Sequence, residues 1–269
     1  LWRARDTVRD YLRGDPGTRG RMLTALLSWN ATVAATSDPK VLLDLPTLIK
    51  LVRGLTPPLH DETVIPGQAR TFRVLEDSNL EPTEYTVVLP PEYHPARSYP
   101  TVVVLHDGRG VKSAVDMWQA ETRRRGYILI APEFLIRGQP PDYRYSESEH
   151  AAVILSLRDA LKRFAIDSDR VGLVGQILGG QMALDFGLAH PDLFSCIASI
   201  SGLPAKHVFV YRNQAELLPM YMVLGGLTPA AEEVGLSFAK GLMLKYNDVT
   251  FVDYPQRGPE DFPEEVAPV

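Results

Sequence analysis

The sequence predicts an α/β fold with a mostly parallel sheet of roughly eight strands, helices on both faces, and a small helical region in front of it. Two observations carry this expectation. From about residue 70 onward, short apolar runs alternate with longer stretches of helical periodicity. One run, Val171-Gly-Leu-Val174, passes through closely spaced glycines directly into an apolar helix. Such alternation is typical of βαβ units, whose parallel strands are covered on both faces.

Composition is that of an ordinary globular protein. The chain has 269 residues, 45% of them hydrophobic and 23% charged, with a net charge of −5. This balance indicates no preference for nucleic acid. No apolar run reaches the roughly 18 residues of a transmembrane helix, so we expect a soluble protein, cytoplasmic or exported after processing. Cys196 is the only cysteine, which excludes an intrachain disulfide, and it is expected in the core.

Residues 1–54 are expected to form the helical region. Asp15-Pro16 and Ser37-Asp-Pro39 are helix start signals, and apolar residues at helical spacing follow each of them. Residues 55–69 are rich in proline and glycine and are interpreted as a linker. Residues 70–269 then form the α/β domain. Its strands are expected at 72–75, 85–89, 101–105, 127–131, 169–174, 197–200, 220–224 and 249–252, with helices near 113–125, 146–164 and 179–188.

The central turn of this domain is Gly175-Gln-Ile-Leu-Gly179. In a G-x-S-x-G nucleophile elbow the middle residue is a strained serine, and the glycines leave room for the backbone. Here Ile177 occupies the middle position and has no heteroatom to attack a carbonyl. A β-branched residue at positive φ is disfavoured by roughly 1–3 kcal/mol. We therefore expect this turn to be relaxed compared with an active elbow.

From about residue 70 to the end, the order of elements resembles the α/β-hydrolase superfamily, in its bacterial serine esterase and prolyl-oligopeptidase-like branch. Leu105-His-Asp-Gly108 resembles the loop that supplies one oxyanion-hole amide. Ala165-Ile-Asp-Ser-Asp-Arg-Val171 resembles the lead-in to the elbow, and Ala189-His-Pro-Asp-Leu-Phe194 resembles the end of the elbow helix. The resemblance implies a triad in the order Ser, then Asp or Glu, then His.

The three triad positions are occupied by other residues. Ile177 stands at the nucleophile position. Where relatives commonly carry Gly-x-x-Asp, this chain reads Gly225-Gly-Leu-Thr228, and where they read Arg-Gly-His-Glu, it reads Arg257-Gly-Pro-Glu260. Thr228 and Pro259 thus replace the acid and the base. The resemblance implies a pseudo-hydrolase that has lost its Ser-Asp-His triad.

Two residual sites remain open as alternatives. The amides of Leu178 and Gly108 can retain a vestigial oxyanion hole; the alternative is a pocket plugged by Ile177, Leu178 and Pro259. Ser201, with His106 and Asp107, is a candidate substitute site. The alternative is that these residues only make ordinary hydrogen bonds at strand ends. His60, His94 and His207 have no cysteine, histidine or acid at metal-ligand spacing, so we expect no metal. The sequence has no phosphate loop and no dinucleotide fingerprint in a suitable place, so we expect no cofactor.

The first hypothesis is therefore a catalytically inactive hydrolase-fold protein that acts as a binding, scaffold or assembly subunit. Its contact surfaces, toward a protein partner or in a homo-oligomer, would be the N-terminal helices or the last strand. Residues 261–269 are expected to be too short for a full covering helix over that strand. The alternatives are an active carboxylic-ester hydrolase or peptidase with a displaced nucleophile, and a small-molecule receptor that uses the vestigial pocket.

Overall fold

The computed structural model describes residues 21, 24, 57, 59, 63–74, 82–135, 138–205, 207–226, 229–245 and 248–269. The chain divides into two compact units, one made of residues 1–62, 94–98 and 161–165 and the other of the remaining residues. The helical region expected over residues 1–54 lies outside the described residues, apart from Arg21 and Thr24, which are helical. That region and the linker boundaries stay predictions.

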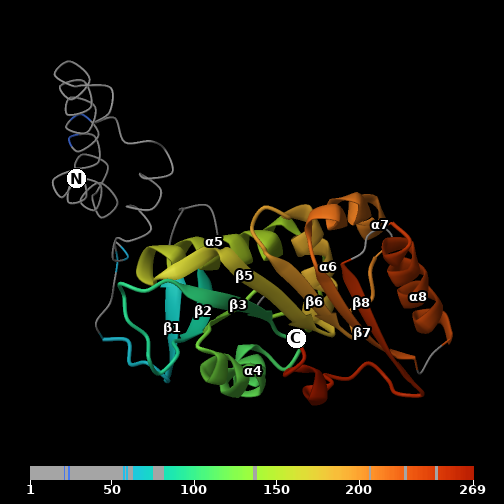
Figure 1. Ribbon diagram of the computed structural model, residues 1–269, viewed down its shortest axis with the longest axis horizontal. Coiled ribbons are helices and arrows are strands. Elements are labelled where there is room, and N and C mark those ends of the chain that lie inside the picture. Colours follow the sequence, from blue (N-terminus) through green and yellow to red (C-terminus); the bar gives the residue numbers. More distant parts are fainter. Residues whose placement is uncertain are drawn as a thin grey trace. The chain divides into compact units, whose positions relative to one another are not determined.

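An eight-stranded sheet forms the centre of the larger unit, as predicted (Figure 1). Its strand order is β1-β2-β4-β3-β5-β6-β7-β8. β2 pairs antiparallel with β1 on one side and with β4 on the other. All further neighbours, from β4 through β3, β5, β6 and β7 to β8, pair in parallel. The strands are β1 Ala69–Val74, β2 Thr83–Val88, β3 Tyr99–Leu105, β4 Ile128–Pro132, β5 Ile166–Gln176, β6 Cys196–Ile200, β7 Met220–Gly226 and β8 Val249–Pro255.

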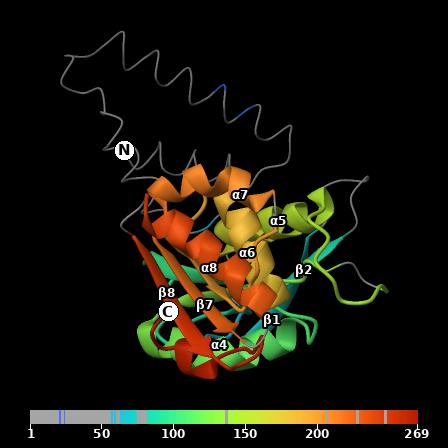
Figure 2. The same cartoon turned by 90° about the vertical axis from the view of Figure 1, so that its right-hand side faces the viewer.

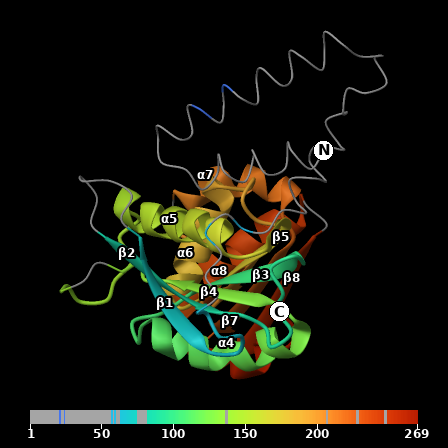
Figure 3. The same ribbon diagram turned by 90° about the vertical axis from the view of Figure 1, so that its left-hand side faces the viewer.

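Helices cover both faces of the sheet, which confirms the predicted α/β class. Helix α4 (Val111–Arg125) lies on one face, and α5 (Glu147–Arg163), α6 (Leu178–Ala189) and α8 (Pro229–Met243) lie on the other, as two further views show (Figures 2 and 3). A short α7 (Val208–Tyr211) and the 3₁₀ turns at Arg212–Leu217 and Pro263–Glu265 complete the described helices. None of the helices in the described part of the chain has both the length and the hydropathy to cross a bilayer.

The central strands are apolar because both of their faces are buried in the core. All five residues of β4 are buried, because helices lie above and below the middle of the sheet. On the α4 face, Trp118 of the helix packs with Val104, Val174 and Phe262 in one apolar cluster. Phe262 comes from the segment after β8, so the end of the chain contributes to the core of this face.

Cys196 is a correction to the sequence analysis, because it is exposed and not part of the core. It is the first residue of β6, and the four residues after it are buried. A hollow of about 280 Å³ at this end of the strands is lined by Cys196 together with Val102, Leu173 and Val266. An apolar run indicates that a strand is buried as a whole, but its first residue lies at the sheet margin.

A capping box starts α5 and holds the loop in front of it. The backbone N–H of Ser146 donates to Glu149 Oε2 at 2.8 Å, and the N–H of Glu149 donates to Ser146 Oγ at 3.3 Å. The N–H of Arg144 also donates to Glu149 Oε1 at 3.1 Å. Glu149 is only 1% exposed, so these hydrogen bonds satisfy a carboxylate that is withdrawn from water.

Replacing Glu149 by alanine is expected to lower the free energy of unfolding by roughly 1–3 kcal/mol, since the N–H groups of Arg144 and Ser146 lose a charged acceptor. Urea unfolding followed by circular dichroism measures this loss. Glu147→Ala is the matched control, because Glu147 lies in the same first turn of α5 but is exposed. Equal unfolding midpoints for the two variants would show that the capping box contributes no stability.

Candidate active site at the strand-to-helix elbow

The turn between β5 and α6 has the strained backbone of an elbow. Ile177 lies at φ 53° and ψ −105°. The expectation of a relaxed turn is therefore wrong, and the reason is tertiary packing. A Cβ atom on Gly175 would lie 1.9 Å from the carbonyl oxygen of Gly179, and one on Gly179 would lie 2.0 Å from that of Leu105. The backbones approach so closely that the turn has no room to relax, although strain of this kind costs roughly 1–3 kcal/mol.

Backbone hydrogen bonds fix the same turn from both sides. The N–H of Ile177 donates to the carbonyl of Ile200 at 2.8 Å, and the N–H of Gln181 donates to the carbonyl of Ile177 at 3.0 Å. The side chain of Ile177 is half-buried at the position where an elbow presents its nucleophile. It carries only carbon and hydrogen, so the intact elbow presents no group that can form an acyl intermediate.

The loop after β8 carries Pro259, which is exposed. The loop is fastened to the end of β6, because Ser201 Oγ donates to the carbonyl of Glu260 at 2.6 Å and accepts from its N–H at 3.1 Å. It is also fastened to the elbow strand, since Gln176 Nε2 donates to the carbonyl of Asp261 at 3.1 Å. Thr228, at the expected acid position, lies outside the described residues.

The loop after β3, expected to supply an oxyanion amide, is tied to the loop after β8 as well. Asp107 accepts hydrogen bonds from the N–H of Arg109 at 2.9 Å and from its Nε at 2.8 Å, and the same guanidinium pairs with Asp261. Pro141 lies over Gly108, because a Cβ on that glycine would be 3.0 Å from the proline Cβ. That the amides of Gly108 and Leu178 form a vestigial oxyanion hole stays a prediction.

The three residues of the candidate substitute site make their described contacts elsewhere. Ser201 is bonded to Glu260, and Asp107 to Arg109. His106 Nδ1 lies 2.7 Å from the backbone oxygen of Asp107, and its Nε2 lies 2.9 Å from a carboxylate oxygen of Glu133, although not in hydrogen-bond geometry. Among the described contacts, none joins Ser201 to His106 or joins the two side chains of His106 and Asp107. The substitute site stays a prediction.

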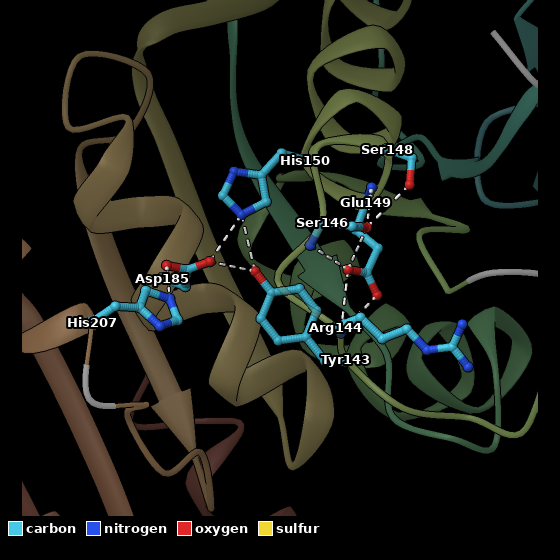
Figure 4. A network of polar contacts seen from close by, with 8 residues as sticks. All are labelled: Tyr143, Arg144, Ser146, Ser148, Glu149, His150, Asp185 and His207. Carbon is cyan, nitrogen blue, oxygen red and sulfur yellow. Dashed lines mark hydrogen bonds and ion pairs between the residues drawn. The ribbon is translucent and has the colours of Figure 1, made fainter.

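A second polar cluster lies on α6, and the sequence analysis does not predict it (Figure 4). Asp185 is at its centre. Its Oδ2 accepts from the Tyr143 hydroxyl at 2.6 Å and lies 2.9 Å from His150 Nε2, while its Oδ1 lies 3.1 Å from His207 Nε2. The available signal was a single charged residue in the otherwise apolar run Met182–Leu188.

Burial and hydrogen bonding set the charges in this cluster. Asp185 is 3% exposed, and burial alone would raise its pKa, but the hydrogen bonds from His150 and Tyr143 outweigh that effect and lower the pKa. Burial, followed by the hydrogen bond to Asp185, raises the pKa of Tyr143 far above its ordinary value. Tyr143 therefore stays a neutral donor and Asp185 an ionised acceptor at neutral pH. The cluster joins α6 to α5 and to two loops.

The fold and the elbow define the class of protein. An eight-stranded, mostly parallel sheet with a strained, glycine-bracketed turn between β5 and α6 is the arrangement of the α/β-hydrolase superfamily. Within it, the chain belongs to the dienelactone hydrolase family, which matches residues 87–227.

Further comparisons give one distant relative and several solved structures of the same fold. An uncharacterized protein of Mycobacterium tuberculosis is 27% identical over 156 residues, which are 57% of this chain but only 38% of that protein. Among solved structures, a thermostable esterase has a TM-score of 0.59 at 20% identity, with 75% of this chain and 57% of the esterase covered. An S-formylglutathione hydrolase from Agrobacterium tumefaciens has a TM-score of 0.59 at 15% identity, covering 77% and 93%. At such identities these structures show the shared fold.

Asp185→Asn is expected to lower the free energy of unfolding by about 2 kcal/mol at pH 7, because hydrogen bonds to a charged group are lost or weakened. The folded-state pKa of Asp185 is lowered, so its contribution is complete above the unfolded value of roughly 3.9 and is lost as pH falls through the folded value. Urea unfolding from pH 7 to pH 3 measures both. The exposed Asp192→Asn is the control, and a difference between the two variants that is constant with pH would contradict the assignment.

Proposed function

We propose that this member of the dienelactone hydrolase family acts by binding, as a scaffold or assembly subunit, and not by ester hydrolysis at its elbow. The observation that carries the proposal is Ile177. The elbow keeps its strained backbone, yet the side chain at its centre has no atom that can attack a carbonyl. Removing the nucleophile of a triad alone lowers the rate by several orders of magnitude.

The surroundings of the elbow support the same proposal. Pro259 replaces the base, and the loop that carries it is hydrogen-bonded to Ser201 and Gln176. The polar groups around the former site are thus engaged with one another, where an active site needs groups that are free for a substrate. In this proposal the N-terminal helices or the last strand contact the partner.

A second candidate is an active carboxylic-ester hydrolase or peptidase with a displaced nucleophile. Family membership favours it, and the similar solved structures include esterases. In this candidate the first amides of α6 would hold the oxyanion. A small-molecule receptor would use the same amides without chemistry. For hydrolysis, Ser201 is the candidate nucleophile to test.

Purified protein is expected to take up no fluorophosphonate probe and to hydrolyse nitrophenyl esters no faster than buffer, because Ile177 offers no nucleophile. Label and turnover are measured for the wild type, for Ile177→Ser and for two alanine variants. Ser201→Ala removes the candidate nucleophile. Ser195→Ala is the matched control, since Ser195 also donates to a backbone carbonyl, that of Val171, but at the opposite end of β6.

Turnover by the wild type that is lost in Ser201→Ala and kept in Ser195→Ala would replace the proposal with the second candidate. Label acquired only by Ile177→Ser would support the proposal, since it would show that the wild-type elbow lacks a nucleophile, while Pro259 still supplies no base. Equal labelling of the wild type and Ile177→Ser would place a reactive group elsewhere and contradict the proposal.

A further inference from the structure

The two edges of the sheet differ in how they are protected. β1 is one edge, and it carries the exposed residues Arg70 and Arg73. Charged side chains on an edge strand are a common defence against pairing with another chain. β8 is the other edge, and its only charged residue is the half-buried Asp253. No residue in the described ranges pairs with the outer side of β8 (Figure 1).

The backbone of β8 presents a defined set of outward groups. The N–H of Met220 in β7 donates to the carbonyl of Asp248, so Asp248 faces β7. Alternation along the strand then turns residues 250, 252 and 254 toward β7 as well. The N–H and C=O groups of Val249, Phe251 and Asp253 point to the open edge. Pro255 follows them and has no N–H to donate.

We propose that a second copy of this chain pairs antiparallel with β8, with the two-fold axis at Phe251. Phe251 then lies opposite Phe251 of the second copy, and Val249 lies opposite Asp253. This register satisfies the outward groups of all three residues on both copies. A shift of two residues in one direction places Val249 opposite Pro255, which has no N–H. A shift of two residues in the other direction places Asp253 beyond the start of the partner strand. The strand is therefore self-complementary in one register, as a two-fold interface requires.

Side-chain direction fits the same pairing. Val252 and Tyr254 pack against the core on the α4 face, so Phe251 and Asp253 lie on the α8 face. The two-fold axis places the two Phe251 rings side by side on that face, and aromatic cross-strand pairs stabilise sheets. It also places the α8 helices of both copies on one face of a continuous sheet.

Exposed apolar side chains gather on the helices at this end of the sheet. Helices α7 and α8 lie next to each other (Figure 2). They contact each other through Phe209 and Phe238, whose ring centroids are 4.9 Å apart. Leu244, directly after α8, is 90% exposed. Further exposed large hydrophobic residues here are Val210, Tyr211, Val234 and Met243. An interface needs about 1,000 Å² in total, and these helices supply apolar area that one strand edge lacks.

This inference deepens the assembly part of the proposed function by naming the partner and the surface. Its test measures molecular mass and cross-linking, whereas the test of the proposed function measures ester turnover. The dimer and the absence of hydrolysis can therefore be disproved independently. Multi-angle light scattering of the full chain is expected to give twice the 29.9 kDa of one copy. Phe251→Lys puts two like charges opposite each other at the axis and is expected to halve that mass.

Thr250→Lys is the matched control, because Thr250 is exposed on the same strand but its backbone faces β7, and it is expected to stay a dimer. A disulfide provides an independent measurement. With Cys196→Ala as background, Phe251→Cys is expected to form a disulfide between copies, since opposite residues of a hydrogen-bonded pair have Cα atoms about 5.5 Å apart. Thr250→Cys, which lies opposite Val252, is expected to form far less.

Circular dichroism checks that each variant is folded. A monomeric wild type would overturn the proposal. A dimer that persists in Phe251→Lys and shows no disulfide in Phe251→Cys would also overturn it and move the interface to another surface, such as the N-terminal helices. If Phe251→Lys fails to fold, the disulfide comparison between positions 251 and 250 decides alone.

Discussion

The structure depends on the close approach of backbones at the glycines of the elbow. Gly175 lies against Gly179, Gly179 against the carbonyl of Leu105, and Gly180 against Gly202, at distances that leave no space for a Cβ atom. β3, β5, β6 and α6 therefore come into direct main-chain contact at the elbow. Because this packing imposes the turn, Ile177 keeps a conformation that its β-branched side chain disfavours. The elbow in this chain is a requirement of the fold, and it persists without the residue whose chemistry it serves in active hydrolases.

The loops around the elbow are also held by contacts within the protein. In an active site, polar groups at the carboxyl edge of the sheet stay available to a substrate. Here Ser201, Gln176 and Arg109 direct their hydrogen bonds to the loop between Gln256 and Phe262. Deeper in the helix that starts at the elbow, Asp185 gathers Tyr143, His150 and His207. Both sets of contacts join segments that are far apart in the sequence. These polar residues, which could be mistaken for catalytic groups, thus hold loops and helices together.

The sequence predicts the sheet well because its signals are local. Most strands contain a short apolar run, and Ile177 and Pro259 stand within motifs whose neighbours are recognisable. The backbone of Ile177 was not predictable, since intrinsic preference favours negative φ and only packing against β3 reverses it. The cluster around Asp185 was equally hidden, because its partners come from segments 22 to 42 residues away. A single charged residue in an apolar helix indicates that it needs a hydrogen-bond or ion-pair partner, but it does not indicate which residue that is.

The proposed interface and the elbow are connected through a short stretch of chain. β8 ends at Pro255, and the loop that follows it is hydrogen-bonded within a few residues to Ser201 and to Gln176, which precedes Ile177. A partner strand on β8 would restrain the start of this loop, and a ligand beside the elbow would contact its end. Energetic coupling requires such a contiguous set of packed contacts. Under the proposed function, the loop that carries Pro259 has no base to position. The proposed function and the proposed pairing along β8 are therefore mutually consistent.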